Sequence, residues 1–443
     1  MKIIQGEEFG SFWKTAKSGN DDDKVTASVK EIIAAVRTDG DFAVRHYASR
    51  FEKCQAAELE VPLIETERAL CCLRKNEPEL AAAMELAARH IKQFSMKQKA
   101  QFTDFEYEIE EGLITGQIII PVEKAAIYSP AGRFPLFSTV LMGLIPAFCA
   151  GVKELVLVSP PQENGLPDRH ILAAAGLAAE TCGVLKTSPS AALRVFAMGG
   201  AQAIAALALG TKSVPRVDLI VGPGNKYVAA AKRILFGEVG IDFIAGPTDV
   251  LIITDGSMDG RVSAIAAADM IAQAEHDPDA CARCLVPGME QARLIAEALE
   301  RKLANLPAAE TARASLDSNG LIIVYQNTEE AARIANLIAP EHLELQITDA
   351  RAWIPRLKNY GSLFIGSLSA EVLGDYSAGI NHTLPTSGSS RWTGGLSIRN
   401  FLKTVTTLRC FPGQGFKAAL KAAEILAVAE GLEGHAASAA ARL

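Results

Sequence analysis

The stretch GQIIIPVEKAAIYSP, residues 116–130, is a run of β-branched and aliphatic residues that ends in a proline. Three similar runs follow along the chain: KELVLVSPP (153–161), LRVFAMGG (193–200) and VDLIVGPG (217–224). Helix-like stretches rich in alanine, such as DRHILAAAGLAAETCG, separate them. Strands that alternate with helices predict a parallel sheet with helices on both faces.

The same rhythm repeats in the second half of the chain, in TDVLIITDG, CARCLVPG, NGLIIVYQN and GSLFIGSL. We therefore predict an α/β fold with two Rossmann-like parallel-sheet domains in series, residues 106–240 and 241–380. Residues 1–105 are predicted to form a helical N-terminal region because their apolar positions recur at helical spacing. Residues 381–443 are predicted to form loops and a helical C-terminal tail.

The length, composition and charge of the chain indicate what class of protein it is. With 443 residues it can build two or three hydrophobic cores, and 49% apolar and 21% charged residues are typical of globular proteins. The formal charge is only −7 and no Lys/Arg cluster is present, so we expect no nucleic-acid partner.

An uncharged run, residues 134–152, is nearly long enough to span a bilayer, but it contains two prolines and two glycines. We predict a buried loop and helix there and no membrane association. Residues 1–10 lack a signal-peptide pattern, so a cytoplasmic location with reduced thiols is expected for the eight cysteines. The CxxC of Cys281 and Cys284 has no second pair at zinc-ribbon spacing and is interpreted as two thiols in a strand.

Glycine-rich turns follow three of the predicted strands: YSPAGR (128–133), MGGAQ (198–202) and VGPGNKY (221–227). Ligands of α/β sheets bind beyond the carboxyl ends of strands, and glycines let backbone N–H groups approach an anion or a nucleotide. None of the turns is a GxGxxG fingerprint, and tight turns also need glycine for steric reasons. The three together favour a nucleotide site in this domain.

The stretch MIAQAEHDPDA, residues 270–280, follows an apolar helix-like run. Gln273 and His276 are three residues apart, so on a helix they share one face and can hold a metal ion. Capping or hydrogen bonding at a helix end is the more common use of such residues. His46 and His90 lie on the N-terminal helices and are expected to be surface or core histidines without a role.

Two other segments carry groups suited to acid–base or metal chemistry. In APEHLEL, Glu341 and His342 can act as an acid–base pair because imidazole titrates near neutral pH, although adjacent polar residues in a turn are also ordinary surface. LGDYSAGINHTLPT holds Asp375 and His382 in a long loop, and such loops are often functional.

These residues combine with a histidine of the tail into one possible metal site. Two imidazoles and two oxygen donors suit a zinc-like divalent ion. The candidate ligands are Gln273, His276, Asp375 and His435. Glu341 and His342 would then remain for proton transfer.

Several long segments, in this order, closely resemble the histidinol dehydrogenase family. The resemblance runs from about residue 115 to the C-terminus, and more weakly through the N-terminal helices. The segments are GGAQAIAALALGT, VDLIVGPGNKYVAAAKR, GEVGIDFIAGPTDVLI, DMIAQAEHDPDA, APEHLEL and GDYSAGINHTLPTSG.

The resemblance implies a zinc-containing homodimer that uses two NAD to oxidise L-histidinol to L-histidinal and then to L-histidine. It implies that His342 is the base for the alcohol proton and that Glu341 activates water in the second oxidation. The implied metal ligands are Gln273, His276, Asp375 and His435, with His435 supplied by the partner subunit. The implied NAD contacts are Tyr128, Gln202 and Asn225. The implied substrate contacts are Thr248, Gln273, His276, His342, Asp375, His382, Glu430 and His435.

The sequence departs from the family pattern at two turns. AGPTD, residues 245–249, stands where the family usually has AGPSE, and PAG, residues 130–132, stands where PGG is usual. Arg133 with Phe134, and the segment TGGLSIRNFLKTVT, resemble related enzymes that oxidise sulfopropanediol, whereas STVLM (138–142) is typical of histidinol dehydrogenases.

Histidinol is therefore the expected substrate, and the alternative is another small alcohol such as sulfopropanediol, with Arg133 or a neighbouring residue pairing its anion. A non-catalytic nucleotide-binding protein is a third possibility, but the intact ligand set and the Glu–His pair argue against it. A plain structural α/β protein would leave the clustering of these residues unexplained.

Overall fold

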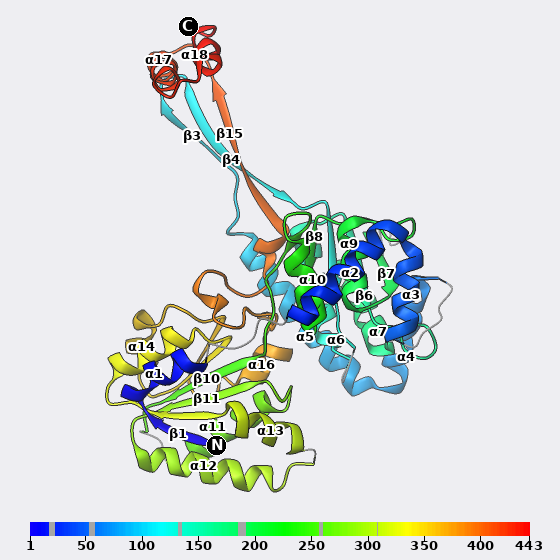
Figure 1. Ribbon diagram of the computed structural model, residues 1–443, viewed down its shortest axis with the longest axis vertical. Helices are drawn as coiled ribbons and strands as arrows, with labels where there is room; N and C mark the ends of the chain where they lie inside the picture. The colour runs from blue at the N-terminus through cyan, green and yellow to red at the C-terminus, as the bar shows by residue number, and fades with distance from the viewer. Residues whose placement is uncertain (17–22, 53–57, 132–134, 185–191, 257–259, 308) are drawn as a thin grey trace.

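The computed structural model describes residues 1–443 apart from residues 17–22, 53–57, 132–134, 185–191, 257–259 and 308. Its framework consists of two six-stranded sheets and one three-stranded sheet. Figure 1 shows the two larger sheets side by side, each surrounded by helices, and the third sheet rising from them as a long arm. The two larger sheets with their helices are called the first unit and the second unit below.

The first sheet has the strand order β2-β7-β6-β5-β8-β9. Its parallel strands are β5 (Lys124–Tyr128), β6 (Glu154–Ser159), β7 (Leu193–Ala197), β8 (Leu219–Val221) and β9 (Gly240–Ile241). β2 (Glu60–Val61) runs antiparallel to β7. The strands are continuous apolar runs because both faces are covered: Leu155 and Leu157 face one core, and Val156 and Val158 face the other.

In the described part of the chain, four helices cover each face of the first sheet. One layer contains α2 (Asp23–Asp39), α3 (Asp41–Phe51), α9 (Gly200–Leu209) and α10 (Lys226–Leu235). The other contains α4 (Ile64–Asn76), α5 (Pro78–Lys99), α6 (Phe137–Ala150) and α7 (Arg169–Cys182). Helix α6 is buried, which confirms the helix predicted within the uncharged run. Among the described residues, no helix has both the length and the apolarity that a membrane crossing requires.

The second sheet is parallel throughout and has the order β1-β12-β11-β10-β13-β14. Its strands are β1 (Lys2–Gln5), β10 (Asp249–Thr254), β11 (Cys281–Val286), β12 (Leu321–Val324), β13 (His342–Gln346) and β14 (Ser362–Ile365). One face is covered by α1 (Gly6–Ala16), α14 (Thr328–Ile338) and α15 (Ala350–Trp353), the other by α11 (Gly260–Ala274), α12 (Met289–Leu303) and α13 (Ala309–Asn319).

The predicted α/β class with parallel sheets is confirmed. The two large sheets share one strand arrangement, that of half a Rossmann fold. β5 lies between β6 and β8 in the first sheet, and β10 lies between β11 and β13 in the second. The two CxxC thiols lie in β11, as expected. A short helix, α16 (Glu371–Tyr376), and three 3-10 turns, η2 (Ile354–Arg356), η3 (Ser389–Arg391) and η4 (Ile398–Phe401), follow in the last third of the chain.

The arm is an antiparallel sheet of order β15-β4-β3, and two helices lie at its tip (Figure 1). Its elements are β3 (Phe105–Glu110), β4 (Leu113–Pro121), β15 (Leu402–Cys410), α17 (Gln414–Ala429) and α18 (Glu433–Ala440). Every residue of β3 is exposed. The helices expose large apolar side chains as well, among them Leu426 (63% exposed) and Val428 (61%).

The structure differs from three expectations drawn from the sequence. Residues 116–121 of the opening run belong to β4 in the arm rather than to the parallel sheet, because their partner β15 lies almost 300 residues later and leaves no local signal. The same β15 interrupts the tail that was expected to contain only loops and helices. The N-terminal region is not wholly helical, because β1 and β2 join the edges of the two large sheets and are too short to show a period.

Candidate active site

Glu341 and His342 lie at the amino-terminal end of β13, beside the amino-terminal end of β10. The two strands pair with Val250 opposite His342, which brings Thr248 and Asp249 next to Glu341. Glu341 and His342 are 5% and 3% exposed. The interpretation of this Glu–His pair as ordinary surface is therefore wrong, because the turn before β13 directs both side chains into the protein.

The carboxylate of Glu341 is held by donors from the neighbouring strand. Its Oε2 accepts hydrogen bonds from the Thr248 hydroxyl and from the backbone N–H of Asp249, the latter at 3.1 Å. In return, the backbone N–H of Glu341 donates to Asp249 Oδ1 at 3.0 Å, and Arg283 pairs with Asp249 Oδ2 at 3.1 Å. Burial raises the pKa of Glu341 to about 7, although the charge of His342 and these donors oppose the change.

Three carboxyl groups surround the imidazole of His342. Its Nδ1 lies 3.5 Å from Glu371 Oε1 and 3.8 Å from Glu341 Oε2, and its Nε2 lies 3.7 Å from Asp375 Oδ1. Burial alone would lower the pKa of His342, but the three carboxylates outweigh it and raise the pKa well above its ordinary value. His342 is thus set to take up a proton, and Asp375, whose pKa is lowered by His342 against the effect of burial, stays ionised.

Glu371 is a site residue that the sequence reasoning missed. It is 4% exposed, and burial raises its pKa well above the ordinary value. It begins α16, and its backbone N–H donates to Glu344 Oε1 at 3.0 Å. A signal was available, because Glu371 and Asp375 are four residues apart and share one face of a helix. Glu371, His342 and Asp375 form the one group of acidic and histidine ligand atoms in the described residues that is compact enough to hold a metal ion.

Gln273, near the C-terminal end of α11, is completely buried between Thr248 and Glu371. With the amide nitrogen toward Glu371, it donates to Oε1 and Oε2 at 2.5 and 3.2 Å, and its oxygen lies 2.6 Å from the Thr248 hydroxyl. Thr248 carries a single proton, which serves either Gln273 or Glu341. The amide therefore couples the carboxyl groups on the two sides of the site.

His276 lies beyond the end of α11, which stops at Ala274. The expected sharing of one helix face with Gln273 is therefore wrong, because His276 stands in the following turn and is exposed. Its charge still acts on Asp375 and on His382, so the turn keeps it near the site. His382 donates from Nδ1 to the Asp375 carbonyl at 2.9 Å.

Glu430 and His435 are not brought to this site within one chain. They lie at the tip of the arm, in the helical pair α17–α18 (Figure 1). Both line a hollow of about 370 Å³ there. The rest of the predicted set, in contrast, gathers around the amino ends of β10 and β13. The prediction that His435 completes the metal site of a partner subunit stays a prediction.

The three predicted NAD contacts lie at the carboxyl ends of strands in the first unit. Gln202 and Asn225 line a cavity of about 490 Å³ together with Gly200, Tyr47 and Phe51. The rings of Tyr47 and Phe51 are stacked, with 5.7 Å between their centroids. The Tyr128 hydroxyl accepts a hydrogen bond from the Gly200 N–H at 3.1 Å. The cavity is roomy enough for part of a nucleotide, and its glycine turn and ring pair suit a phosphate and a base.

A buried carboxyl group, Glu52, lies behind this cavity. Its Oε1 accepts from the Gln202 amide at 3.3 Å, and burial raises the pKa of Glu52 to about 7. Glu52 Oε2 and Gln202 Oε1 are buried and have no hydrogen-bond partner among the described residues. Such atoms indicate a polar site that a ligand or water completes.

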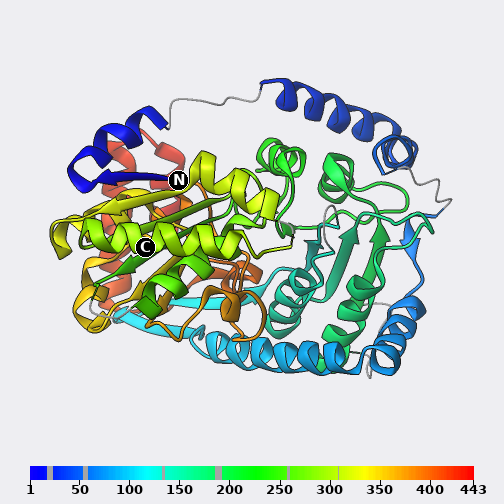
Figure 2. The same ribbon diagram turned by 90° about the horizontal axis from the view of Figure 1, so that it is seen from below.

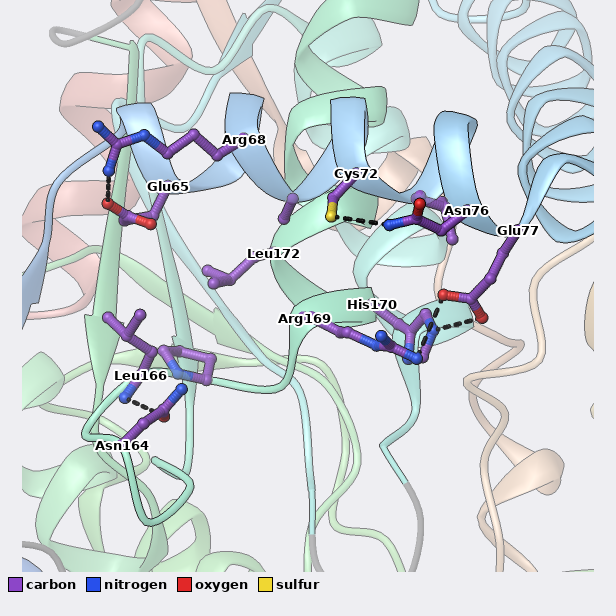
Figure 3. Close-up of a pocket in the computed structure, with 13 residues that line it drawn as sticks. Glu65, Arg68, Cys72, Asn76, Glu77, Asn164, Leu166, Arg169, His170 and Leu172 are labelled. Carbon is purple, nitrogen blue, oxygen red and sulfur yellow. Dashed lines mark hydrogen bonds and ion pairs between the residues drawn. The ribbon is translucent and has the colours of Figure 1, made fainter.

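A second hollow, of about 240 Å³, lies between α4 and the start of α7 (Figure 3). Figure 3 shows its charged groups paired with one another: Arg68 with Glu65, and His170 and Arg169 with Glu77. The polar groups are satisfied within the protein, so we assign no function to this hollow. The His170 side chain is only 18% exposed because of these contacts.

The substrate-related turn at Gly132, Arg133 and Phe134 lies outside the described residues, so its role as an anion partner stays a prediction. The neighbouring STVLM segment opens α6, and the Thr139 hydroxyl lies 3.1 Å from His382 Nε2.

Comparison with known proteins identifies the family of the chain. The family model described as histidinol dehydrogenase matches residues 15–443. Histidinol dehydrogenase of Pseudomonas aeruginosa is 40% identical over 95% of this chain and 92% of its own length, and that of Aquifex aeolicus is 42% identical over 92% and 90%. The crystal structure of histidinol dehydrogenase from Elizabethkingia anophelis aligns with a TM-score of 0.88 and 32% identity, covering 100% of this chain and 97% of that one. The chain belongs to the histidinol dehydrogenase family.

Proposed function

We propose that this protein oxidises L-histidinol to L-histidine in two NAD-dependent steps through L-histidinal, the last steps of histidine biosynthesis. The observation that carries the proposal is the buried pair of Glu341 and His342, set among the Gln273 amide and the Asp375 carboxylate. Family membership supplies the substrate class, since the relatives at 40–42% identity are named histidinol dehydrogenases.

His342 is the general base of the first oxidation. Its Nδ1 and Nε2 are buried and have no hydrogen-bond partner among the described residues. In the neutral ring one of them carries a proton, and the other can accept the proton of the alcohol. The surrounding carboxylates stabilise the imidazolium that results.

Glu341 activates water in the second oxidation. A carboxyl group whose pKa lies near 7 can hold and release a proton at neutral pH, which is what a general base requires. The Thr248 hydroxyl and the Asp249 N–H donate to this carboxylate and fix its orientation. The carboxylate is therefore already oriented when the aldehyde forms.

The oxygen donors fit a zinc site. Gln273 is fully buried and Asp375 is half-buried beside His342, each offers an oxygen donor, and His276 lies within range of Asp375. Gln273, His276 and Asp375 of one chain, with His435 of a second copy, would hold the ion. Zinc would polarise and orient the substrate's hydroxyl and amino groups. His342 is kept for proton transfer, since a metal-bound imidazole nitrogen cannot act as a base.

NAD fits the cavity of the first unit. The buried polar atoms of Gln202 and Glu52 that lack partners and the stacked rings of Tyr47 and Phe51 suit its hydroxyl groups and its base. NAD supplies the hydride acceptor of both steps. Gly200 and Asn225 stand at the amino ends of α9 and α10, where helix dipoles favour the pyrophosphate.

The arm favours a homodimer with shared sites. β3 is exposed along its length, and α17 exposes Leu426 and Val428, so the arm has an apolar surface that a second copy can cover. Glu430 and His435 lie with α17 and α18 at the tip of this arm, away from the second unit that carries Glu341 (Figure 1). A second copy would therefore bring them to the site.

The test is NADH formation by purified, zinc-loaded protein with NAD and L-histidinol, run beside sulfopropanediol. Two NADH per histidinol are expected, because each oxidation transfers one hydride. Turnover of sulfopropanediol without turnover of histidinol would overturn the proposed substrate.

A further inference from the structure

The segment Ser377–His382 follows α16 directly and joins the second unit to helices of the first. Figure 2 shows this part of the chain, in orange, close to α5. Three side-chain hydrogen bonds make the connection: the His90 ring to the Ser377 carbonyl at 2.7 Å, the Asn381 amide to the Met142 carbonyl at 2.7 Å, and the Thr139 hydroxyl to His382 at 3.1 Å. The bonds come from α5 and α6, not from the sheet that carries Glu341.

His90 contacts the segment at two points. Because a carbonyl oxygen only accepts, His90 Nδ1 must carry the proton and donate it to Ser377. Gly379 lies against the backbone of the same residue, in a left-handed conformation with φ 89°, and a Cβ there would stand 2.6 Å from the His90 carbonyl oxygen. Glycine is therefore required at position 379 both by its conformation and by this close approach.

The segment sets the positions of two predicted site residues. Asp375 precedes Ser377 by two residues, and the six-residue helix α16 is too short to hold its own end in place. His382 donates from Nδ1 to the Asp375 carbonyl, so its Nε2 is unprotonated and accepts from Thr139. Asp375 and His382 thus depend on one another and on the anchoring of the segment to α5 and α6.

We propose that His90 is a positioning residue, which holds the Ser377–His382 segment through the Ser377 carbonyl and thereby fixes Asp375 and His382 at the metal and substrate site. The inference rests on the proposed function for the role of Asp375, but the anchoring itself does not.

The test compares His90→Leu, which removes the donor at similar volume, with His90→Asn, whose amide nitrogen can occupy the position of Nδ1. Arg89→Ala, at an exposed neighbouring position of α5, is the matched control. Hydrogen exchange of residues 377–382 is measured in the full-length protein, together with zinc affinity by competition with a chromophoric chelator, NAD affinity and the thermal midpoint.

In His90→Leu, we expect faster exchange over residues 377–382 and zinc affinity lowered about 10- to 100-fold, as for loss of a group that orients a ligand. NAD affinity should be unchanged because the cofactor cavity lies elsewhere. His90→Asn should restore both properties, and Arg89→Ala should change neither.

Wild-type exchange and zinc affinity in His90→Leu would overturn the proposal. Equal impairment of His90→Asn and His90→Leu would also overturn it, because the donor would then not be what holds the segment. If the wild-type protein binds no zinc, the proposed function fails, and exchange over residues 377–382 alone decides whether His90 anchors the segment.

Discussion

Asp249 and Glu341 hold one another across two neighbouring strands: the backbone N–H of each residue donates to the side-chain carboxylate of the other, at 3.1 and 3.0 Å. Arg283, from the strand on the other side of β10, pairs with the remaining oxygen of Asp249. Asp249 stands where the family usually has glutamate. The shorter side chain still reaches both partners, so the departure preserves the support of the catalytic carboxylate.

Asp249→Ala should destabilise the protein by on the order of 3 kcal/mol, because it removes the carboxylate partner of the largely buried Arg283 guanidinium and leaves the buried N–H of Glu341 without an acceptor. The midpoint of urea unfolding measures this. Arg313→Ala is the control, since its ion pair with Glu300 is exposed and is worth at most about 1 kcal/mol. Equal midpoints for the two variants would contradict the proposed support.

Glu341→Gln should separate the two oxidations. The amide cannot activate water, so the second step should slow by about 10²- to 10⁴-fold while hydride transfer from the alcohol continues. In a single turnover, NADH per histidinol should fall from two to one, and the aldehyde should be trapped by a hydrazine reagent. Glu329→Gln, at a 73% exposed position, should keep the full yield. A full yield from Glu341→Gln would assign water activation to another group.

A mixture of His435→Ala and Glu341→Ala proteins should regain activity if the arm serves the neighbouring subunit. In a mixed dimer, one site receives an intact Glu341 from one chain and an intact His435 from the other. Random reassortment of a C2 dimer should give about a quarter of the wild-type activity. Each variant alone should be inactive. A mixture as inactive as its components, after exchange of subunits is verified by mass, would place both residues in one chain's site.

The pH dependence of stability should report on Glu52. Its pKa rises from the ordinary 4.5 to about 7 on folding because the carboxyl group is buried. Between these two pKa values, the folded protein therefore binds more protons than the unfolded chain. The contribution of Glu52 to the free energy of unfolding is fully present below about pH 4.5 and is lost as the pH rises through 7. The full effect is on the order of 3 kcal/mol. The thermal midpoint of the wild type, relative to Glu52→Gln, should fall between pH 5 and 8, and a constant difference would contradict a buried, titrating Glu52.

The local sequence was sufficient for the elements that are buried on both faces. Runs such as LRVFAMGG and TDVLIITDG became parallel strands because their apolar character is continuous, and the helices between them formed as the spacing predicts. The arm could not be predicted in this way. β4 and β15 pair across almost 300 residues, and their alternating exposure in an isolated sheet differs little from that of loops.

The residues of the candidate site also fall into two groups: those that local motifs identify, and those whose roles appear only in the folded chain. Glu341, His342, Asp375 and Gln273 were identified from motifs and lie together. Arg283 was missed because its role depends on a tertiary neighbour, Asp249, which it reaches from β11. Glu371 was missed although its spacing from Asp375 was a signal, because its contact with His342 forms only in the folded chain. His276 was placed on a helix because periodicity cannot locate a helix end to within two residues.

The pairing of β1 with β12 has a consequence for biosynthesis on the ribosome. Lys2–Gln5 forms an edge of the second sheet only after Leu321–Val324 has been synthesised, so the first strand waits unpaired while more than 300 residues emerge. The helices of residues 23–99 can meanwhile pack on the first unit. Such distant pairing slows folding and leaves a strand edge open to other chains. Deleting residues 2–5 should therefore leave the first unit able to fold during synthesis, while the second unit is released with a bare edge at β12.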